Sequence, residues 1–131
     1  MSRRDLIKAL NNLCNEMDYH YNINCGGCCF VTAVLAEQLE YYNIPFKVAI
    51  TYCPTHYAIK IKDRYINRSD YSFKNLYDYN SNTLYNIYNN NYWNDYYSRR
   101  WNLIVKTRIK SVFKQYENSR TRLHNGTFRS R

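Results

Sequence analysis

Apolar positions recur at helical spacing over two stretches in the first third of the chain. The first stretch predicts a helix over about residues 3–18, and Ser2 followed by Asp5 resembles a capping box at its start. A polar segment with a Gly pair follows. A second apolar stripe begins at Cys28 and predicts a helix that ends near Tyr42, before Pro45. The two stripes are Leu6, Ile7, Leu10, Leu13 and Met17, and then Val31, Val34, Leu35, Leu39 and Tyr42.

The next segment changes to the two-residue alternation of β-strands. Residues 46–52 and 56–61 alternate apolar and polar side chains, and a turn at 62–64 leads into a return strand over 65–67. The predicted fold class is therefore α+β. It has an N-terminal helix, a helix that begins at Cys28 and packs on a short antiparallel sheet, and a Tyr-rich helical C-terminal region with a basic tail.

The C-terminal half has weaker signals. Residues 71–97 are rich in Tyr and Asn, and a helical stripe then runs from Tyr92 to about Glu117. Residues 118–131 lack periodicity, so we expect them to be disordered on their own. These patterns predict one domain over residues 1–117 followed by a tail over 118–131. The expected apolar anchors are Leu76, Leu84, Ile87, Trp93, Trp101, Val105, Ile109, Val112 and Tyr116.

Composition changes this picture in two ways. Sixteen Tyr among 131 residues, with few Gly and Pro, indicate an A/T-rich genome such as that of a phage or a parasite. The net charge of +9 lies in residues 98–131, which contain ten Lys or Arg and one acidic residue, Glu117. A basic segment of this kind predicts an acidic partner, either an acidic protein surface or nucleic acid.

The sequence predicts no membrane association. No apolar run is long enough to span a bilayer, and the N-terminus lacks the apolar core of a signal peptide. We therefore expect a cytoplasmic protein, in a host cytoplasm or a virion if the gene is viral. Its five Cys then indicate thiol or metal chemistry in place of a disulfide framework. Cys14 fits a buried apolar position of the first helix.

Cys28 and His56 are the candidate catalytic pair. The first turn of a helix lowers the pKa of a thiol, and the Gly pair before Cys28 leaves room for a substrate carbonyl near backbone N–H groups. His56 opens a predicted strand and would act as the general base. The group that orients the imidazole would be Asn67, with Asp70 as the second choice.

The segment Asn22-Ile23-Asn24-Cys25-Gly26-Gly27-Cys28-Cys29-Phe30 resembles the nucleophile segment of papain-like cysteine peptidases. The Cys-led helix that ends in Asn43-Ile44-Pro45 and feeds two strands is also similar to the core of transglutaminase-like proteins. Both resemblances, over about residues 22–71, imply Cys28 as the nucleophile and a peptide or protein substrate. Asn22 or Asn24 stands for the oxyanion-hole Gln of papain, and Cys29 replaces its Trp.

A zinc site is the main alternative for the same residues. Cys25 and Cys28, with Cys53 and His56, have the spacing of a tetrahedral zinc clamp. The catalytic interpretation needs no cofactor, whereas this alternative needs zinc and describes a binding module. A third hypothesis is a non-catalytic component of a larger assembly, such as a phage particle, that is docked by its basic tail.

Overall fold

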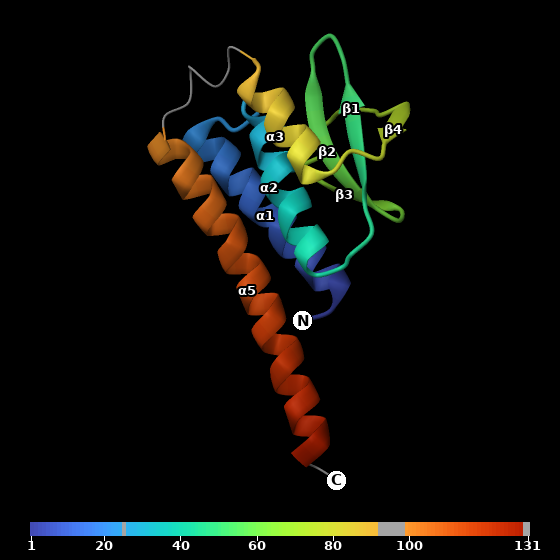
Figure 1. The fold of residues 1–131 in the computed structure, drawn as a ribbon, viewed down its shortest axis with the longest axis vertical. Helices are drawn as coiled ribbons and strands as arrows, with labels where there is room; N and C mark the ends of the chain where they lie inside the picture. Colours follow the sequence, from blue (N-terminus) through green and yellow to red (C-terminus); the bar gives the residue numbers. More distant parts are fainter. Residues whose placement is uncertain (25, 92–98, 130–131) are drawn as a thin grey trace.

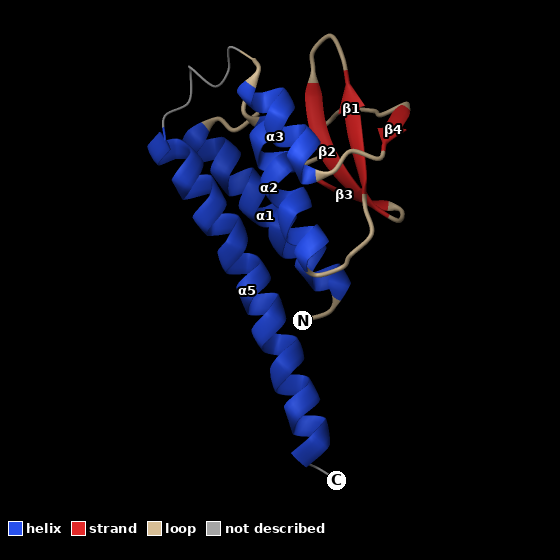
Figure 2. Cartoon of the chain, in the orientation of Figure 1, coloured by secondary structure: helices blue, strands red, loops and turns tan. Residues whose placement is uncertain are grey.

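The computed structural model describes residues 1–24, 26–91 and 99–129, with 121–129 described as backbone. It has the predicted α+β class: in the part of the chain described, helices lie on one side of a four-stranded antiparallel sheet (Figures 1 and 2). The elements are α1 (Arg3–Tyr21), α2 (Cys28–Tyr41), β1 (Lys47–Thr51), β2 (His56–Ile61), β3 (Arg64–Ile66), β4 (Asn75–Tyr77), α3 (Ser81–Asn89) and α5 (Arg99–Arg129).

The ends of α1 follow from its sequence. Ser2 and Asp5 form the predicted capping box, in which each side chain accepts a hydrogen bond from the backbone N–H of the other. The helix continues three residues past the predicted end, to Tyr21. It stops where Asn22 adopts a left-handed conformation with φ of 52°. Asn adopts this conformation more readily than most residues other than Gly.

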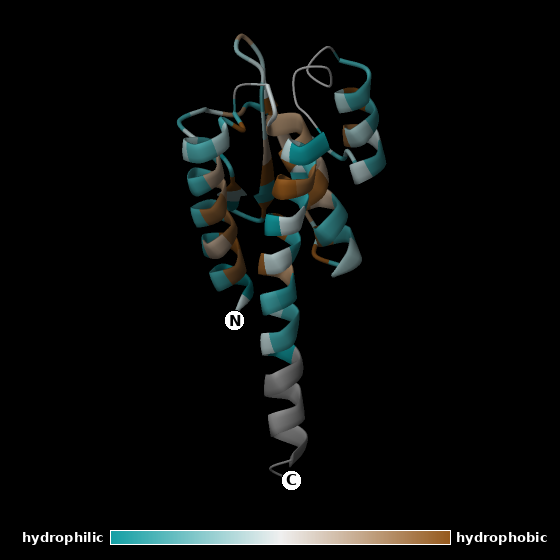
Figure 3. Ribbon diagram, turned by 90° about the vertical axis from the view of Figure 1, so that its left-hand side faces the viewer, coloured by the Kyte–Doolittle hydropathy of each residue, from teal (hydrophilic) through white to brown (hydrophobic). Residues whose placement is uncertain are grey.

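Helix α2 is the central helix of the domain. Most of its side chains are buried, Val31 and Leu35 among them, and the helix contacts β2, α3 and α5. Asn43 has the left-handed conformation expected after the helix, with φ of 57°. Figure 3 shows apolar colours concentrated between the helices, where α2 packs against its neighbours.

The sheet has the order β3-β2-β1-β4, with every neighbouring pair antiparallel. Val48 pairs with Ile59 and Ile50 with Tyr57, and these side chains belong to the same buried core as α2. His56, at the start of β2, has the opposite orientation to Tyr57 because side chains alternate along a strand. Helix α2 therefore lies on the Tyr57 face, and His56 lies at the end of the strand.

Two elements were not predicted from the sequence. Strand β4 pairs with β1, and α3 packs against α2 with Leu84 fully buried. Leu84 is one of the apolar anchors that the sequence predicted. Leu76 was predicted as another, but it is 43% exposed, so that prediction was wrong. Trp93 lies outside the described residues.

Helix α5 corrects the expectation for the C-terminus. Its buried residues Val105, Ile109 and Tyr116 follow the predicted stripe, and Phe113 extends that stripe. The helix does not end near Glu117, however, but continues to Arg129, beyond the rest of the domain (Figure 1). A helix that tertiary packing has already nucleated can propagate because each added residue gains a backbone hydrogen bond, even though residues 118–129 include Asn, Ser, Thr and Gly, which have low helix propensity. The expected disordered tail is therefore wrong for residues 118–129.

Candidate functional site

The start of α2 meets the start of β2, and Cys28 lies at this junction. The backbone N–H groups of Tyr57, the residue after His56, and of Cys28 and Cys29 act to lower the pKa of the Cys28 thiol. Gly27, the N-cap of α2, contributes no side-chain cap, so the first N–H groups of the helix remain available to this sulfur. Cys28 therefore lies beside the residue that follows His56 in β2, while the His56 side chain itself has the opposite orientation to Tyr57.

Gly27 is required at this turn for steric reasons. A Cβ at this position would come within 2.6 Å of the Trp101 ring and 2.8 Å of the Ile23 carbonyl oxygen. Trp101 also donates a hydrogen bond from Nε1 to the Tyr21 carbonyl at 3.3 Å. The start of α5 is therefore packed directly against the turn that precedes Cys28.

Burial overrides the expected lowering of the Cys28 pKa. The side chain is 3% exposed, and desolvation raises the pKa of the thiol above its usual 9.0. The surrounding backbone N–H groups act in the predicted direction, but their effect is smaller, and the carboxylate of Asp18 adds a further rise. In this closed conformation Cys28 is a protonated thiol at neutral pH.

The imidazole of His56 is held in a defined orientation. Its Nε2 lies 2.7 Å from the carbonyl oxygen of Asn67, so this nitrogen carries the proton and donates it. Nδ1 then has the lone pair, and it has no hydrogen-bond partner among the described residues. His56 is only 1% exposed, and such an unsatisfied buried nitrogen carries a free-energy penalty that calls for an explanation.

Asn67 contacts His56 through its backbone carbonyl, whereas the sequence suggested its side chain for this role. Its side chain is instead paired with Asn24, whose Oδ1 accepts from Asn67 Nδ2 at 3.1 Å. Asn11 of α1 accepts from the Asn67 backbone N–H at 2.9 Å. These contacts fix Asn67 in a left-handed conformation with φ of 63°, which aims its carbonyl at the imidazole.

The other predicted members of the site are placed differently. Asp70 is exposed and lines a groove beside α1, and no contact between it and His56 is recorded in the described part of the chain. Asn22 is exposed at the end of α1, whereas the Asn24 side chain is committed to Asn67. Of the two oxyanion-hole candidates, Asn24 is thus the one joined to the His56 network.

The zinc alternative involves residues in dissimilar surroundings. Cys53 is exposed in the β1–β2 turn, Cys28 is buried, and Cys25 lies outside the described residues. Within the described ranges no three His, Cys, Asp or Glu side chains are grouped so that they could hold a metal ion. The predicted zinc ligands include Cys25, which lies outside the described residues. The zinc clamp therefore stays a prediction of the sequence.

Asp18 is a site residue that the sequence interpretation missed. Its Oδ1 accepts the Asn24 backbone N–H at 3.0 Å, and its charge raises the pKa of both Cys28 and His56. An acidic residue in the last turn of a helix opposes the helix dipole, and this unfavourable placement was the available signal. Tyr71 was also missed: its ring stacks on His56 with centroids 4.5 Å apart.

The free energy of unfolding should decrease as the pH falls from about 7.5 to about 5.5. Burial lowers the His56 pKa below 6.5 despite the Asn67 hydrogen bond and Asp18, so the unfolded chain binds this proton first. Denaturant titrations across this range measure the slope. His56→Gln should flatten it. Equal slopes for wild type and His56→Gln would contradict the assignment.

Comparisons with known proteins add no family assignment. No protein-family model, no curated protein and no solved structure matches the chain. In the part of the chain described, no helix combines the length and the apolar character needed to cross a membrane. The site geometry therefore carries the functional argument by itself.

Proposed function

We propose that this protein is a cysteine hydrolase of the peptidase or amidase type, with Cys28 as nucleophile and His56 as general base. The observation that supports it most is the buried His56 ring. Its Nε2 donates to the Asn67 carbonyl and its Nδ1 has no hydrogen-bond partner among the described residues, while the backbone N–H of the next residue, Tyr57, acts to lower the pKa of the Cys28 thiol. Nucleophilic catalysis needs a base of fixed tautomer next to a thiol. In the structure Nδ1 makes no hydrogen bond to the Cys28 thiol, so the proposal requires the two groups to come together when the site opens.

The reaction would proceed in two steps. Nδ1 of His56 accepts the thiol proton while the Cys28 sulfur bonds to the carbonyl carbon of an amide or ester. The N–H groups at the start of α2 stabilise the oxyanion, and the imidazolium then protonates the leaving group as its bond to the acyl carbon breaks. Water, deprotonated by Nδ1, hydrolyses the resulting thioester and regenerates the thiol.

Access to this pair requires a local opening. Cys28 and His56 are both nearly inaccessible, and Tyr71, with Phe73 beyond it, covers the imidazole. These two aromatic residues belong to the segment between β3 and β4, which is held by ring stacking and by hydrogen bonds between Arg68 and Tyr71. A substrate would displace this segment, and the loss of burial would lower the Cys28 pKa towards the range of a reactive thiol.

Acylation of the protein tests the proposal. The full chain is incubated with p-nitrophenyl acetate, and peptide mapping by mass spectrometry locates the acetyl group. We expect acetylation of Cys28, which is lost in Cys28→Ser and retained in Cys14→Ser and Cys53→Ser. Cys53 controls for simple exposure and Cys14 for burial. Acetylation of Cys53 alone would contradict the hydrolase.

A non-catalytic role in an assembly is the second candidate, and the projecting part of α5 favours it. The helix extends past the domain, and residues 118–131 carry four of the ten Lys and Arg that follow residue 98, with no acidic residue among them. Such a rod would dock on nucleic acid or an acidic surface. A gel-shift assay with a DNA duplex and a titration with polyglutamate test this role. Truncation after Glu117 should abolish binding to the DNA duplex or to polyglutamate, whichever the intact chain binds. Retained binding would count against docking through the rod.

A further inference from the structure

A small pocket with an apolar floor and a cationic rim lies at the opposite end of the strands from His56. Its volume is about 280 Å³, and its lining comes from the start of β1, the end of β2, β4 and the first turn of α1. The floor consists of Pro45, Phe46, Ile61 and Leu76, and the rim consists of Arg3, Lys47, Lys60 and Lys62. No acidic residue lines it.

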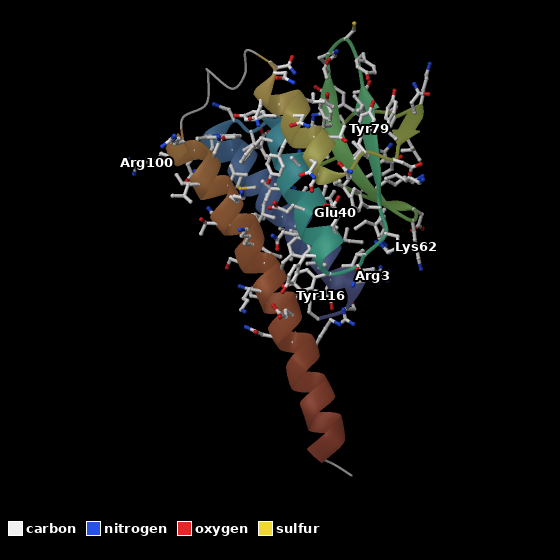
Figure 4. All side chains as sticks on the ribbon, in the orientation of Figure 1. Arg3, Glu40, Lys62, Tyr79, Arg100 and Tyr116 are labelled. Atoms are coloured by element: carbon white, nitrogen blue, oxygen red, sulfur yellow. The ribbon has the colours of Figure 1, made fainter. Side chains whose placement is uncertain are left out.

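The like charges of the rim are unfavourable for the stability of the isolated protein. Lys47 and Lys60 are directly opposite each other in the β1–β2 register, and like charges in that position destabilise a sheet. Lys47 is partly compensated by an exposed ion pair with Asp78, and Lys60 lies over the ring of Tyr65. No ion pair is recorded for the other two rim cations among the described residues, and Figure 4 shows Arg3 and Lys62 at the same end of the sheet.

The floor exposes apolar side chains to solvent, whereas the surface of a soluble protein is usually polar. Leu76 is 43% exposed, and Phe46 is only partly covered by the core against which it packs. The volume is slightly below the range of pockets that enclose a whole small ligand, but it suits one inserted side chain. An apolar pocket of this size surrounded by cations fits an anchor residue flanked by acidic residues.

We propose that this pocket docks an acidic segment of a partner protein, with one apolar side chain of that segment inserted against Phe46, Ile61 and Leu76. Charge complementarity with the four rim cations selects the acidic flanks, and the concave floor selects the anchor. A membrane surface fits less well, because membrane-binding faces protrude and carry large apolar areas, whereas this floor is recessed. The docking site is independent of the hydrolase proposal.

Fluorescence polarisation with a peptide panel tests the inference. Each labelled peptide has acidic flanks around a central Leu, Ile, Phe, Met or Ala. We expect at least one apolar centre to bind with a Kd below about 1 mM, and the Ala peptide to bind at least about tenfold more weakly. Leu76→Ala, at an exposed position, should weaken the best peptide, while Cys28→Ser should not.

A charge-matched pair of variants separates the pocket from the overall charge. Arg3→Gln/Lys62→Asn removes two rim cations and places Asn where Lys62 has φ of 55°, a conformation that Asn tolerates. Lys110→Gln/Lys114→Gln removes the same charge from α5. The first variant should weaken binding about tenfold and the second less than about twofold. Equal losses, no saturable binding by any peptide, or binding of anionic phospholipid vesicles alone would overturn the proposal.

Discussion

His56→Gln should lower the rate of Cys28 acylation and of thioester hydrolysis by about 10²- to 10⁴-fold, the usual contribution of a general base. The Gln side chain can place an amide nitrogen near the position of Nε2, so it retains a donor for the Asn67 carbonyl. It has no basic atom at the position of Nδ1. The variant thus removes the base and preserves the buried hydrogen bond, and p-nitrophenolate release in stopped flow measures the loss.

The matched control is His56→Asn. Its amide nitrogen lies near the Nδ1 position, so it loses both the base and the donor to Asn67. Both variants should lose activity, but only His56→Asn should leave a buried acceptor unpaired and lose about 1–3 kcal/mol of additional stability. Unchanged acylation in a folded His56→Gln would show that Nδ1 is not the base, and the protein would then fit the non-catalytic candidate.

The sequence predicts the N-terminal half of the fold well because local signals there agree with the tertiary structure. The capping box at Ser2, the left-handed position at Asn43 and the alternation over residues 56–61 each determine a backbone conformation on their own. Where several local rules point to one structure, the boundaries follow to within a few residues.

The C-terminal half depends on contacts between distant segments. Strand β4 is three residues long and exists because β1 offers an open edge. Helix α3 is short, and its stability comes from packing on α2, where the carboxylate of Glu40 also accepts a hydrogen bond from the Ser81 backbone N–H. Neither element has a periodic pattern long enough to identify from the chain alone.

For the site, the sequence predicted the residues better than their interactions. Cys28 lies at the start of α2 and His56 at the start of β2, but the His56 ring is oriented by a carbonyl, and any residue type could supply that group. The side chain of Asn67 serves a different purpose, in its pair with Asn24. The net pKa of Cys28 depends on burial by distant segments, which no local motif encodes.

Phe113→Ala should lower the free energy of unfolding by about 3–5 kcal/mol, the range for deleting a fully buried aromatic side chain. Phe113 is 0% exposed on α5, and its ring stacks on Tyr42 of the α2 C-cap with centroids 5.7 Å apart. Its loss would leave a cavity between the two helices. Urea denaturation followed by circular dichroism measures the change.

Leu103→Ala provides the control on the same helix, because Leu103 is 65% exposed and should cost less than about 0.5 kcal/mol. The comparison decides whether α5 is part of the domain or an appended rod. In the structure α5 contacts α1 and α2, and its first turns cover the Gly27 turn with Trp101. If Phe113→Ala cost as little as Leu103→Ala, the packed half of α5 would not belong to the core, and the Cys28 turn would lose its cover in solution.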